Sequence, residues 1–236
     1  MRAGGTHVIV VTGRMFQSVR RYLEAAALDD PVVCYQGALI ADPVTGEWLR
    51  HVPIPLAPAH EALDAVIEAG FHINAYTNDE LYVAEPTPEA HAYADLNQVQ
   101  MHVVGDLRDW LREPPTKLVA VGDPDALDEL EAELKPRFAD RLFISKSLPH
   151  FLEFAHPEVN KGAGLTFVAD RLGFGPEETV ACGDGENDRE LLDWAGFGVA
   201  VANAHEDVLE RADLVVPSVQ EEGVAALLEA YLDSAA

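Results

Sequence analysis

Apolar and polar residues along this chain follow patterns that predict alternating strands and helices. Near the N-terminus, four apolar β-formers at 8–11 lead into a Thr-Gly-Arg loop at 12–14, and an amphipathic stretch follows at 16–28. This segment predicts a buried strand that enters a helix through a short loop. An Asp-Asp-Pro sequence at 29–31 predicts the end of that helix.

The next residues predict a strand and a hairpin, followed by a second unit. Strand-like runs at 31–54 surround a turn signal at 42–46. Three prolines at 53–58 indicate a linker. From 59 to 155 the pattern restarts with helices and strands of an α+β unit, at a length common for a domain.

The remainder of the chain alternates helix and strand in the manner of a parallel sheet with helices on both faces. The fold class is therefore predicted as α/β. We expect a doubly wound parallel core sheet built from residues 1–52 and 157–236. An α+β domain at 53–156 is inserted between the two parts.

Composition excludes several function classes. The 236 residues are 48% apolar and 24% charged, and no apolar run reaches the length of a bilayer crossing. No signal peptide is visible, so a cytoplasmic location is expected. The formal net charge of −25 repels nucleic acid and anionic membranes, and neither is expected as a partner. Cys34 and Cys182 lie in apolar runs without metal-type spacing, which predicts buried residues without a chemical role.

The stretch "VACGDGENDREL" carries the most chemical information. A buried strand ends at Gly183 and is followed by Asp184, Glu186 and Asp188 in a loop that opens a helix. Carboxylates at the carboxyl end of a parallel strand stand where open α/β sheets bind ligands, and such oxygens suit Mg²⁺. The alternative is that these side chains only cap the helix. An EF-hand calcium loop is excluded because Arg189 replaces its glycine.

Two further positions indicate an anion site. Lys161 falls in the first turn of a predicted helix, where the helix dipole disfavours a cation unless an anion or a carboxylate lies opposite. Thr12, with its hydroxyl and the Gly13 amide before a helix, could cradle a phosphate. Each position also has a simpler interpretation, as an exposed lysine and as a helix cap.

The order of these motifs is specific. "VIVVTGR", an inserted α/β unit, "NKG" before a helix and "GDGEND" after a strand together resemble the haloacid dehalogenase superfamily, and within it the Cof-like phosphatases with the larger α/β cap. The resemblance continues through "GVAVANA", "ADLVVPS" and "EEGVAALLE". It implies a Rossmann-like core, a mobile cap and Mg²⁺-dependent hydrolysis of phosphate monoesters.

The resemblance also implies roles for individual residues. Thr12 would hold the transferring phosphoryl group, Lys161 would neutralise it, and Asp188 would hold either the water shell of the metal or Lys161. Phosphate binding would use Thr12, Gly13, Arg14, Lys161 and Asn187, and the metal ligands would be Asp184 and Asp188. The expected partner is a small phosphorylated metabolite, most commonly a sugar phosphate in this family. Mannosyl-phosphoglycerate, trehalose-phosphate and sucrose-phosphate phosphatases share the same architecture and stay open as alternatives.

Two features depart from the family pattern. Gln36 stands where the family usually has asparagine. Family members also begin with an apolar strand that ends in Asp-x-Asp, which supplies the nucleophile and the general acid, whereas "MRAGG" resembles only the end of the helix after that strand. Asp123 and Asp125 have the same spacing, but they lie in the insertion at the start of a predicted helix.

We therefore expect residues 1–236 to lack the nucleophile and to be inactive on their own. The alternative is a non-catalytic module that binds phosphate or metabolites. The missing strand would lie between the strand ending before Thr12 and the strand ending at Gly183. Its absence predicts weak stability, direct pairing of those two strands, or a strand borrowed from a second copy in a homodimer.

Overall fold

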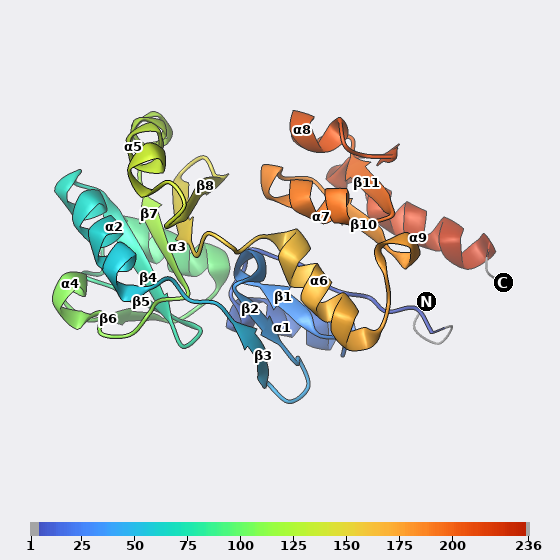
Figure 1. Ribbon diagram of the computed structural model, residues 1–236, viewed down its shortest axis with the longest axis horizontal. Coiled ribbons are helices and arrows are strands. Elements are labelled where there is room, and N and C mark those ends of the chain that lie inside the picture. The colour runs from blue at the N-terminus through green and yellow to red at the C-terminus, as the bar shows by residue number, and fades with distance from the viewer. Residues whose placement is uncertain (1–4, 235–236) are drawn as a thin grey trace. The chain divides into compact units, whose positions relative to one another are not determined.

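The structure, a computed structural model, describes residues 5–234. It divides into two compact units (Figure 1). Unit 1 comprises Met1–Val11 and Asn160–Ala236, and unit 2 comprises Thr12–Val159. Residues 12–52 group here with the insertion, and the division expected at residues 52 and 157 stays a prediction.

Unit 2 contains most of the regular structure of the chain. Its elements in chain order are α1 (Phe16–Ala25), β1 (Val32–Cys34), the 3-10 helix η2 (Tyr35–Gly37), β2 (Leu39–Ala41), β3 (Trp48–His51), α2 (Leu56–Glu68), β4 (His72–Thr77), β5 (Glu80–Val83), α3 (Pro88–Asn97), β6 (Met101–Val103), α4 (Leu107–Trp110), β7 (Lys117–Val121), α5 (Pro124–Phe138), β8 (Phe143–Leu148) and β9 (Phe151–Ala155).

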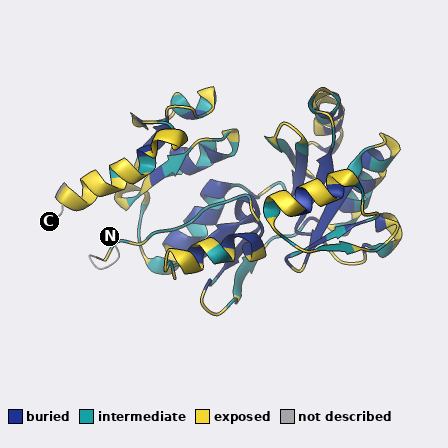
Figure 2. Cartoon of the chain, turned by 180° about the vertical axis from the view of Figure 1, so that it is seen from behind, coloured by how far each residue is buried: buried dark blue, intermediate teal, exposed yellow. Residues whose placement is uncertain are grey.

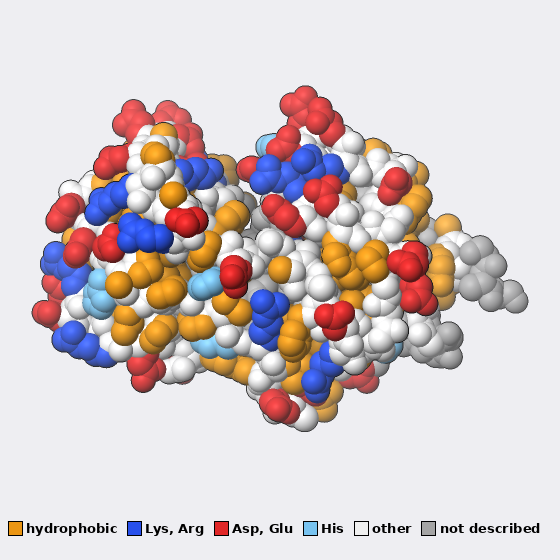
Figure 3. Space-filling model, viewed as in Figure 1, with side chains coloured by type: hydrophobic (Ala, Val, Ile, Leu, Met, Phe, Trp, Pro, Cys, Tyr) orange, Lys and Arg blue, Asp and Glu red, His pale blue; other side chains and the backbone are white. Residues whose placement is uncertain are grey.

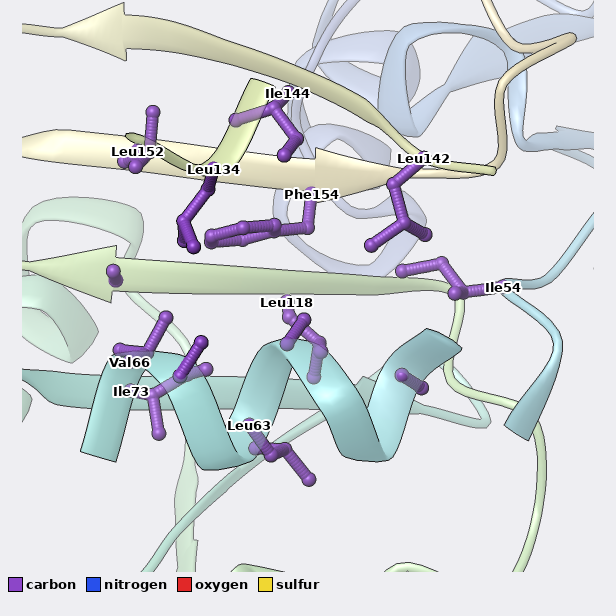
Figure 4. Packing of buried hydrophobic residues seen from close by; sticks show 14 of the residues in the cluster. Ile54, Leu63, Val66, Ile73, Leu118, Leu134, Leu142, Ile144, Leu152 and Phe154 are labelled. Carbon is purple, nitrogen blue, oxygen red and sulfur yellow. The ribbon is translucent and has the colours of Figure 1, made fainter. Parts of the chain in front are cut away.

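A six-stranded sheet in the order β6-β5-β4-β7-β9-β8 forms the centre of unit 2. Only β5 and β6 are parallel, and the other neighbours are antiparallel. Because side chains alternate between the faces of a strand, one face carries an apolar set that packs under α2 and α5. Figure 4 shows this core. Its labelled members are Ile54, Leu63, Val66, Ile73, Leu118, Leu134, Leu142, Ile144, Leu152 and Phe154.

The opposite face of this sheet is more polar. Tyr76 of β4 lies beside Lys117 of β7 in register, and Tyr93 of α3 packs its ring against the rings of Tyr76 and Phe151. Glu153 of β9 lies on the same face, because its register partner Val119 is two residues from Lys117. This face therefore gathers charged and aromatic side chains in a buried position.

Residues 12–52 form a smaller antiparallel sheet in the order β1-β2-β3. The predicted turn at 42–46 does join two strands, because the Asp42 side chain accepts the N–H groups of Val44 and Thr45. The predicted helix is also present as α1. Its buried face includes Phe16, Val19 and Leu23, as the amphipathic pattern indicates.

Unit 1 is built on a parallel three-stranded sheet in the order β10-β11-β12. Ile9 and Val11 pack with the apolar side chains of Leu165, Ala181 and Leu191. Figure 2 shows α9 as mostly exposed. The elements are α6 (Lys161–Leu172), η3 (Pro176–Glu178), β10 (Val180–Gly183), η4 (Glu186–Asp188), α7 (Arg189–Trp194), β11 (Phe197–Val201), α8 (Glu206–Leu209), β12 (Leu214–Val216), η5 (Val219–Glu221) and α9 (Gly223–Ser234).

Two local expectations are wrong. The predicted strand at 8–11 is reduced to a single bridge at Val11, with no strand assigned to 7–10. Apolar residues can be packed without completing the hydrogen-bond ladder that defines a strand, and Ile9 and Val11 are packed in this way. The predicted linker at 53–58 is shorter than expected, since α2 already begins at Leu56. Proline is tolerated in the first turn of a helix, where the N–H groups have no helical partner.

The strands expected in one core sheet form two separate three-stranded sheets within residues 5–234. In that range β10 is an edge strand, and β1 pairs only with β2. The direct pairing considered for the strands that end near Thr12 and at Gly183 is not among the strand pairs of the described chain. None of the described helices has the length and hydrophobicity that a bilayer crossing requires.

Candidate functional site

Acidic side chains are spread over the face of the molecule seen in Figure 3, with Lys and Arg between them. With a net charge of −25, an anionic ligand is repelled by the protein as a whole. Any anion site must therefore depend on local positive charge. The chain has four lysines, and two of them, Lys117 and Lys161, are buried.

Lys161 begins α6 in unit 1. Asn160 caps this helix by accepting the N–H of Ala163 at 2.7 Å. Gly162 allows α6 to approach the segment after β10 closely, since a Cβ there would lie 2.4 Å from the carbonyl oxygen of Glu190. Lys161 is 7% exposed. Its ammonium is thus held at the end of β10 instead of in solvent.

Asp188 is the ion-pair partner of Lys161. The ammonium donates to Asp188 Oδ1 and, at 3.4 Å, to Asn187 Oδ1. Asp188 is 4% exposed, and its Oδ2 accepts the backbone N–H groups of Asp184 and Gly185, each at 3.0 Å. The carboxylate that compensates for a cation in the first turn of α6 is therefore Asp188.

Asp184 follows β10 directly and is exposed. Its backbone is fixed on both sides, because its N–H donates to Asp188 and its carbonyl accepts from His205 at 2.8 Å. Within residues 5–234 its carboxylate forms no hydrogen bond or ion pair, so it is available to a hard cation. No cluster of three or more His, Cys, Asp or Glu side chains suited to a metal occurs in that range.

The loop at Thr12–Arg14 opens unit 2. The Thr12 N–H donates to the carbonyl of Val33 at 2.8 Å, and the Thr12 carbonyl accepts from Gln36 at 3.0 Å. The Arg14 N–H donates to Thr12 Oγ1 at 3.2 Å. The loop is thereby folded into a turn, called here the threonine turn (residues 12–14), which is closed by the bond from the Arg14 N–H to the Thr12 hydroxyl.

Gln36 covers the threonine turn. A Cβ on Gly13 would lie 2.4 Å from Gln36 Nε2, so any other residue at position 13 would displace the end of the Gln36 side chain. Gln36 is 7% exposed and has a positive φ of 60°. Its Oε1 is buried and lacks a hydrogen-bond partner within the described part of the chain. A buried carbonyl oxygen without a donor is costly, and it marks this turn as an incomplete polar site.

The helix α1, which follows the threonine turn, is capped by the side chain of Asp79. The N–H groups of Phe16 and Gln17 donate to the carboxylate of Asp79 at 2.9 and 2.7 Å, and the Tyr35 hydroxyl donates to it at 2.8 Å. Asp79 lies in the β4–β5 turn, where it and Asn78 both have positive φ. The N-terminus of α1 is thus capped by a carboxylate 63 residues away.

Burial raises the pKa of Asp79 from 3.8 to about 6, although hydrogen bonds from Tyr35 and two backbone amides oppose this shift. The folded chain holds this proton more tightly than the unfolded chain. The contribution of Asp79 to stability is therefore fully present below pH 3.8 and is lost as the pH rises through about 6.

We expect the Asp79→Asn variant to lose this pH dependence. The free energy of unfolding of the wild type, relative to the variant, should fall by about 1.4 kcal/mol between pH 5 and pH 7.5, the equivalent of one pKa unit. Urea unfolding at the two pH values measures it. Asp95→Asn, an exposed position on α3, is the control. An equal pH dependence in wild type and Asp79→Asn would contradict the prediction.

Most sequence-predicted residues occur in two local groups. Lys161, Asn187 and Asp188 are in contact in unit 1 beside Asp184, and Thr12, Gly13 and Arg14 form the threonine turn in unit 2. Asp123 is a helix cap, since its Oδ1 accepts the N–H groups of Asp125 and Ala126. This confirms the interpretation of that segment as a helix start.

Sequence reasoning missed Asp79, Lys117 and Glu153. The ammonium of Lys117 donates to Glu153 and to the carbonyl of Gly13. Lys117 is the single charged residue of β7, and Glu153 is the single charged residue of β9. A lone charge in an otherwise apolar strand was the signal in the sequence that could have identified them. Their proximity depends on the pairing of β7 with β9.

Comparison with known proteins shows similarity over nearly the whole chain. The family model described as haloacid dehalogenase-like hydrolase matches residues 1–228. The 5-amino-6-(5-phospho-D-ribitylamino)uracil phosphatase YitU of Bacillus subtilis is 28% identical over 235 residues, which cover 98% of this chain and 87% of that protein.

Two crystal structures have the same fold. A haloacid dehalogenase-like hydrolase from Bacteroides thetaiotaomicron superposes with a TM-score of 0.87 at 25% identity, covering 98% of this chain and 88% of that chain. A protein from Thermotoga maritima superposes with a TM-score of 0.82 at 32% identity, covering 96% and 85%. The α/β fold class predicted from the sequence is confirmed.

Proposed function

Because this chain belongs to the haloacid dehalogenase-like hydrolase family, we propose that its residues bind the phosphate of a small phosphorylated metabolite, a sugar phosphate or similar monoester, for Mg²⁺-dependent hydrolysis. The observation that carries the proposal is the ion pair of Lys161 and Asp188 beside the unengaged carboxylate of Asp184. A buried cation and a free carboxylate at the end of a parallel strand suit a phosphate and a hard metal ion.

The positive charge in this site would come from Lys161. Phosphoryl transfer is catalysed chiefly by positioning and by neutralising charge on the phosphate oxygens. Asp188 restricts the ammonium to one place, while Asn187 Oδ1 gives it a second acceptor. In the threonine turn, the Thr12 hydroxyl would donate to a phosphate oxygen while it accepts from the Arg14 N–H.

The residues present are compatible with Mg²⁺, which accepts few protein carboxylates and keeps several waters. Asp184 would be the direct ligand, because its carboxylate has no partner within residues 5–234. Asp188 already uses both oxygens for Lys161 and two backbone amides, so it would act mainly by holding the loop that carries Asp184. When bound, Mg²⁺ supplies charge neutralisation at the phosphate oxygens.

Residues 1–236 do not contain the nucleophile in the motif expected from the family, an Asp-x-Asp sequence at the end of the first apolar strand. The single Asp-x-Asp that follows a buried strand, at Asp123, forms a helix cap. We therefore propose that these residues alone bind phosphate and Mg²⁺ without turning over a substrate. This is also the behaviour of the alternative, a non-catalytic binding module. The two differ once a nucleophile strand is supplied.

The Asp184→Asn variant tests the metal site. We expect its affinity for Mg²⁺ to fall by about tenfold or more, because a neutral amide oxygen is a poorer ligand than a carboxylate for a hard cation. Isothermal titration calorimetry with MgCl₂ in the presence of inorganic phosphate measures the change. Glu186→Gln removes one negative charge from the same loop at an exposed position and is the matched control. Equal Mg²⁺ affinities for wild type and Asp184→Asn would remove Asp184 from this role.

A further inference from the structure

Unit 2 contains a second buried lysine with a carboxylate partner. Lys117 begins β7 and is 4% exposed, and Glu153 in β9 is 7% exposed. The Lys117 ammonium donates to Glu153 Oε1 at 3.2 Å, and lies 5.2 Å from the centre of the Tyr76 ring and 5.7 Å from that of Tyr35. Burial lowers the pKa of Lys117 and is the largest single influence, but the charge and hydrogen bond of Glu153 together with Tyr93 outweigh it, so the pKa is raised above its ordinary value.

Stability alone gives little reason for this pair. Removing two charges from water costs free energy, and their mutual attraction recovers this cost only when their geometry is good. Proteins in which such a buried pair is replaced by apolar residues are often equally stable. The strands around the pair are otherwise apolar, with Leu118 and Phe154 facing the core on the other side of the sheet. An apolar pair could occupy these positions, so the use of two charges requires another explanation.

The third contact of Lys117 provides one. Its ammonium donates to the carbonyl oxygen of Gly13 at 3.3 Å, in the middle of the threonine turn. The Gly13 carbonyl and the Arg14 N–H belong to one planar trans peptide unit, so they point in opposite directions. A donor that holds the carbonyl oxygen also sets the direction of the Arg14 N–H, which contacts Thr12 Oγ1 at 3.2 Å.

We propose that Lys117 is a positioning residue of the threonine turn, and that with its partner Glu153 it orients the Gly13–Arg14 peptide so that the Thr12 hydroxyl can receive a phosphate. The inference rests on the proposed function of Thr12. Lys117 acts through the backbone of Gly13 and does not itself contact the phosphate. It also makes a β-strand of the insertion part of the anion site, through a residue more than a hundred positions from the turn.

The test replaces both charges with apolar side chains of similar length, in the Lys117→Met/Glu153→Met double variant, so that no unpaired charge stays buried. The dissociation constant for inorganic phosphate with MgCl₂ is measured by calorimetry on the full 236-residue chain. The ¹H–¹⁵N resonance of the Arg14 amide reports the orientation of the peptide. A cooperative urea transition confirms that the variant is folded.

We expect phosphate to bind about tenfold more weakly to the double variant, since a small misplacement of a binding group has effects of this size or larger. The Arg14 amide resonance should also shift. Lys146→Met is the matched control, because Lys146 makes the same types of contact elsewhere in unit 2, with the Pro124 carbonyl at 3.0 Å and with Asp128 at 2.5 Å. It should change neither readout.

A folded double variant that binds phosphate as the wild type does, with an unshifted Arg14 resonance, overturns the inference. If the double variant does not fold, Glu153→Gln is tested by the same readouts, because it loosens the ammonium without burying a lone carboxylate. The proposed function fails separately, when Thr12→Val leaves phosphate affinity unchanged or the wild type does not bind phosphate. In that case, a shift of the Arg14 amide resonance in the double variant still tests whether Lys117 and Glu153 position the Gly13–Arg14 peptide.

Discussion

Replacing Lys161 with methionine should lower the free energy of unfolding by about 3–5 kcal/mol and remove most of the affinity for phosphate. The reason is that Asp188 is 4% exposed, and its Oδ1 would lose the ammonium that pairs with it. A buried charge left without its partner has a cost of this size. The two backbone amides on Oδ2 compensate only in part.

Urea unfolding and calorimetry with inorganic phosphate measure these two effects of Lys161→Met. Lys135→Met is the matched control, because Lys135 also pairs with a carboxylate, Glu131, but is 54% exposed. Exposed pairs contribute little, so its unfolding free energy should change by less than about 0.5 kcal/mol. If the two variants lose equal stability and both still bind phosphate, the ion pair with Asp188 is not the centre of the site.

The second large effect concerns turnover. Residues 1–236 should not hydrolyse a general phosphomonoester, because the roles proposed for Thr12, Lys161 and Asp184 are binding roles, and none of them supplies a group that attacks phosphorus. Adding an upstream apolar strand that ends in Asp-x-Asp-x-Thr, patterned on the family, should produce activity. The gain should be roughly four orders of magnitude or more, the scale on which loss of a nucleophile acts in other enzymes.

The same extended chain should have a higher melting temperature. The resemblance to the family implies that the added strand would lie next to β10. Within residues 5–234, β10 is the edge strand of a three-stranded sheet. Pairing would satisfy its free edge and cover apolar surface. Turnover at ordinary enzymatic rates by the unextended chain, abolished by Asp184→Asn, would show that a nucleophile lies within residues 1–236. Absence of activity in a stabilised extended chain would favour the non-catalytic module.

The part of the site that could be predicted from sequence is local. Asp184, Asn187 and Asp188 lie within one loop between β10 and α7, and the backbone of that short turn is sufficient to bring them together. The cation of Lys161 at a helix N-terminus was predicted to need an anion or a carboxylate opposite it unless the lysine was simply exposed, and the structure places the carboxylate of Asp188 there. Most helices and strands were likewise predictable, because their apolar periodicity is a property of neighbouring residues.

The surroundings of the threonine turn were decided by tertiary structure. Asp79 reaches α1 because two residues of positive φ place it at the tip of the β4–β5 hairpin, and Tyr35 donates to the same carboxylate. Lys117 reaches Gly13 only because β7 pairs with β4 and β9 in one register, and a shift of one residue would turn its side chain to the apolar face.

The amino-acid sequence by itself determined most of the elements, the α/β fold class and the grouping of Asp184, Asn187 and Asp188 in one loop, since these depend on residue types at short spacing. Only the tertiary structure decided that the N-terminus of α1 is closed by a carboxylate and that Lys117 and Glu153 belong beside the threonine turn. Contacts between distant residues depend on sheet register and on the burial of whole faces. The free energy of that packing is shared among many side chains and is not encoded in any one motif.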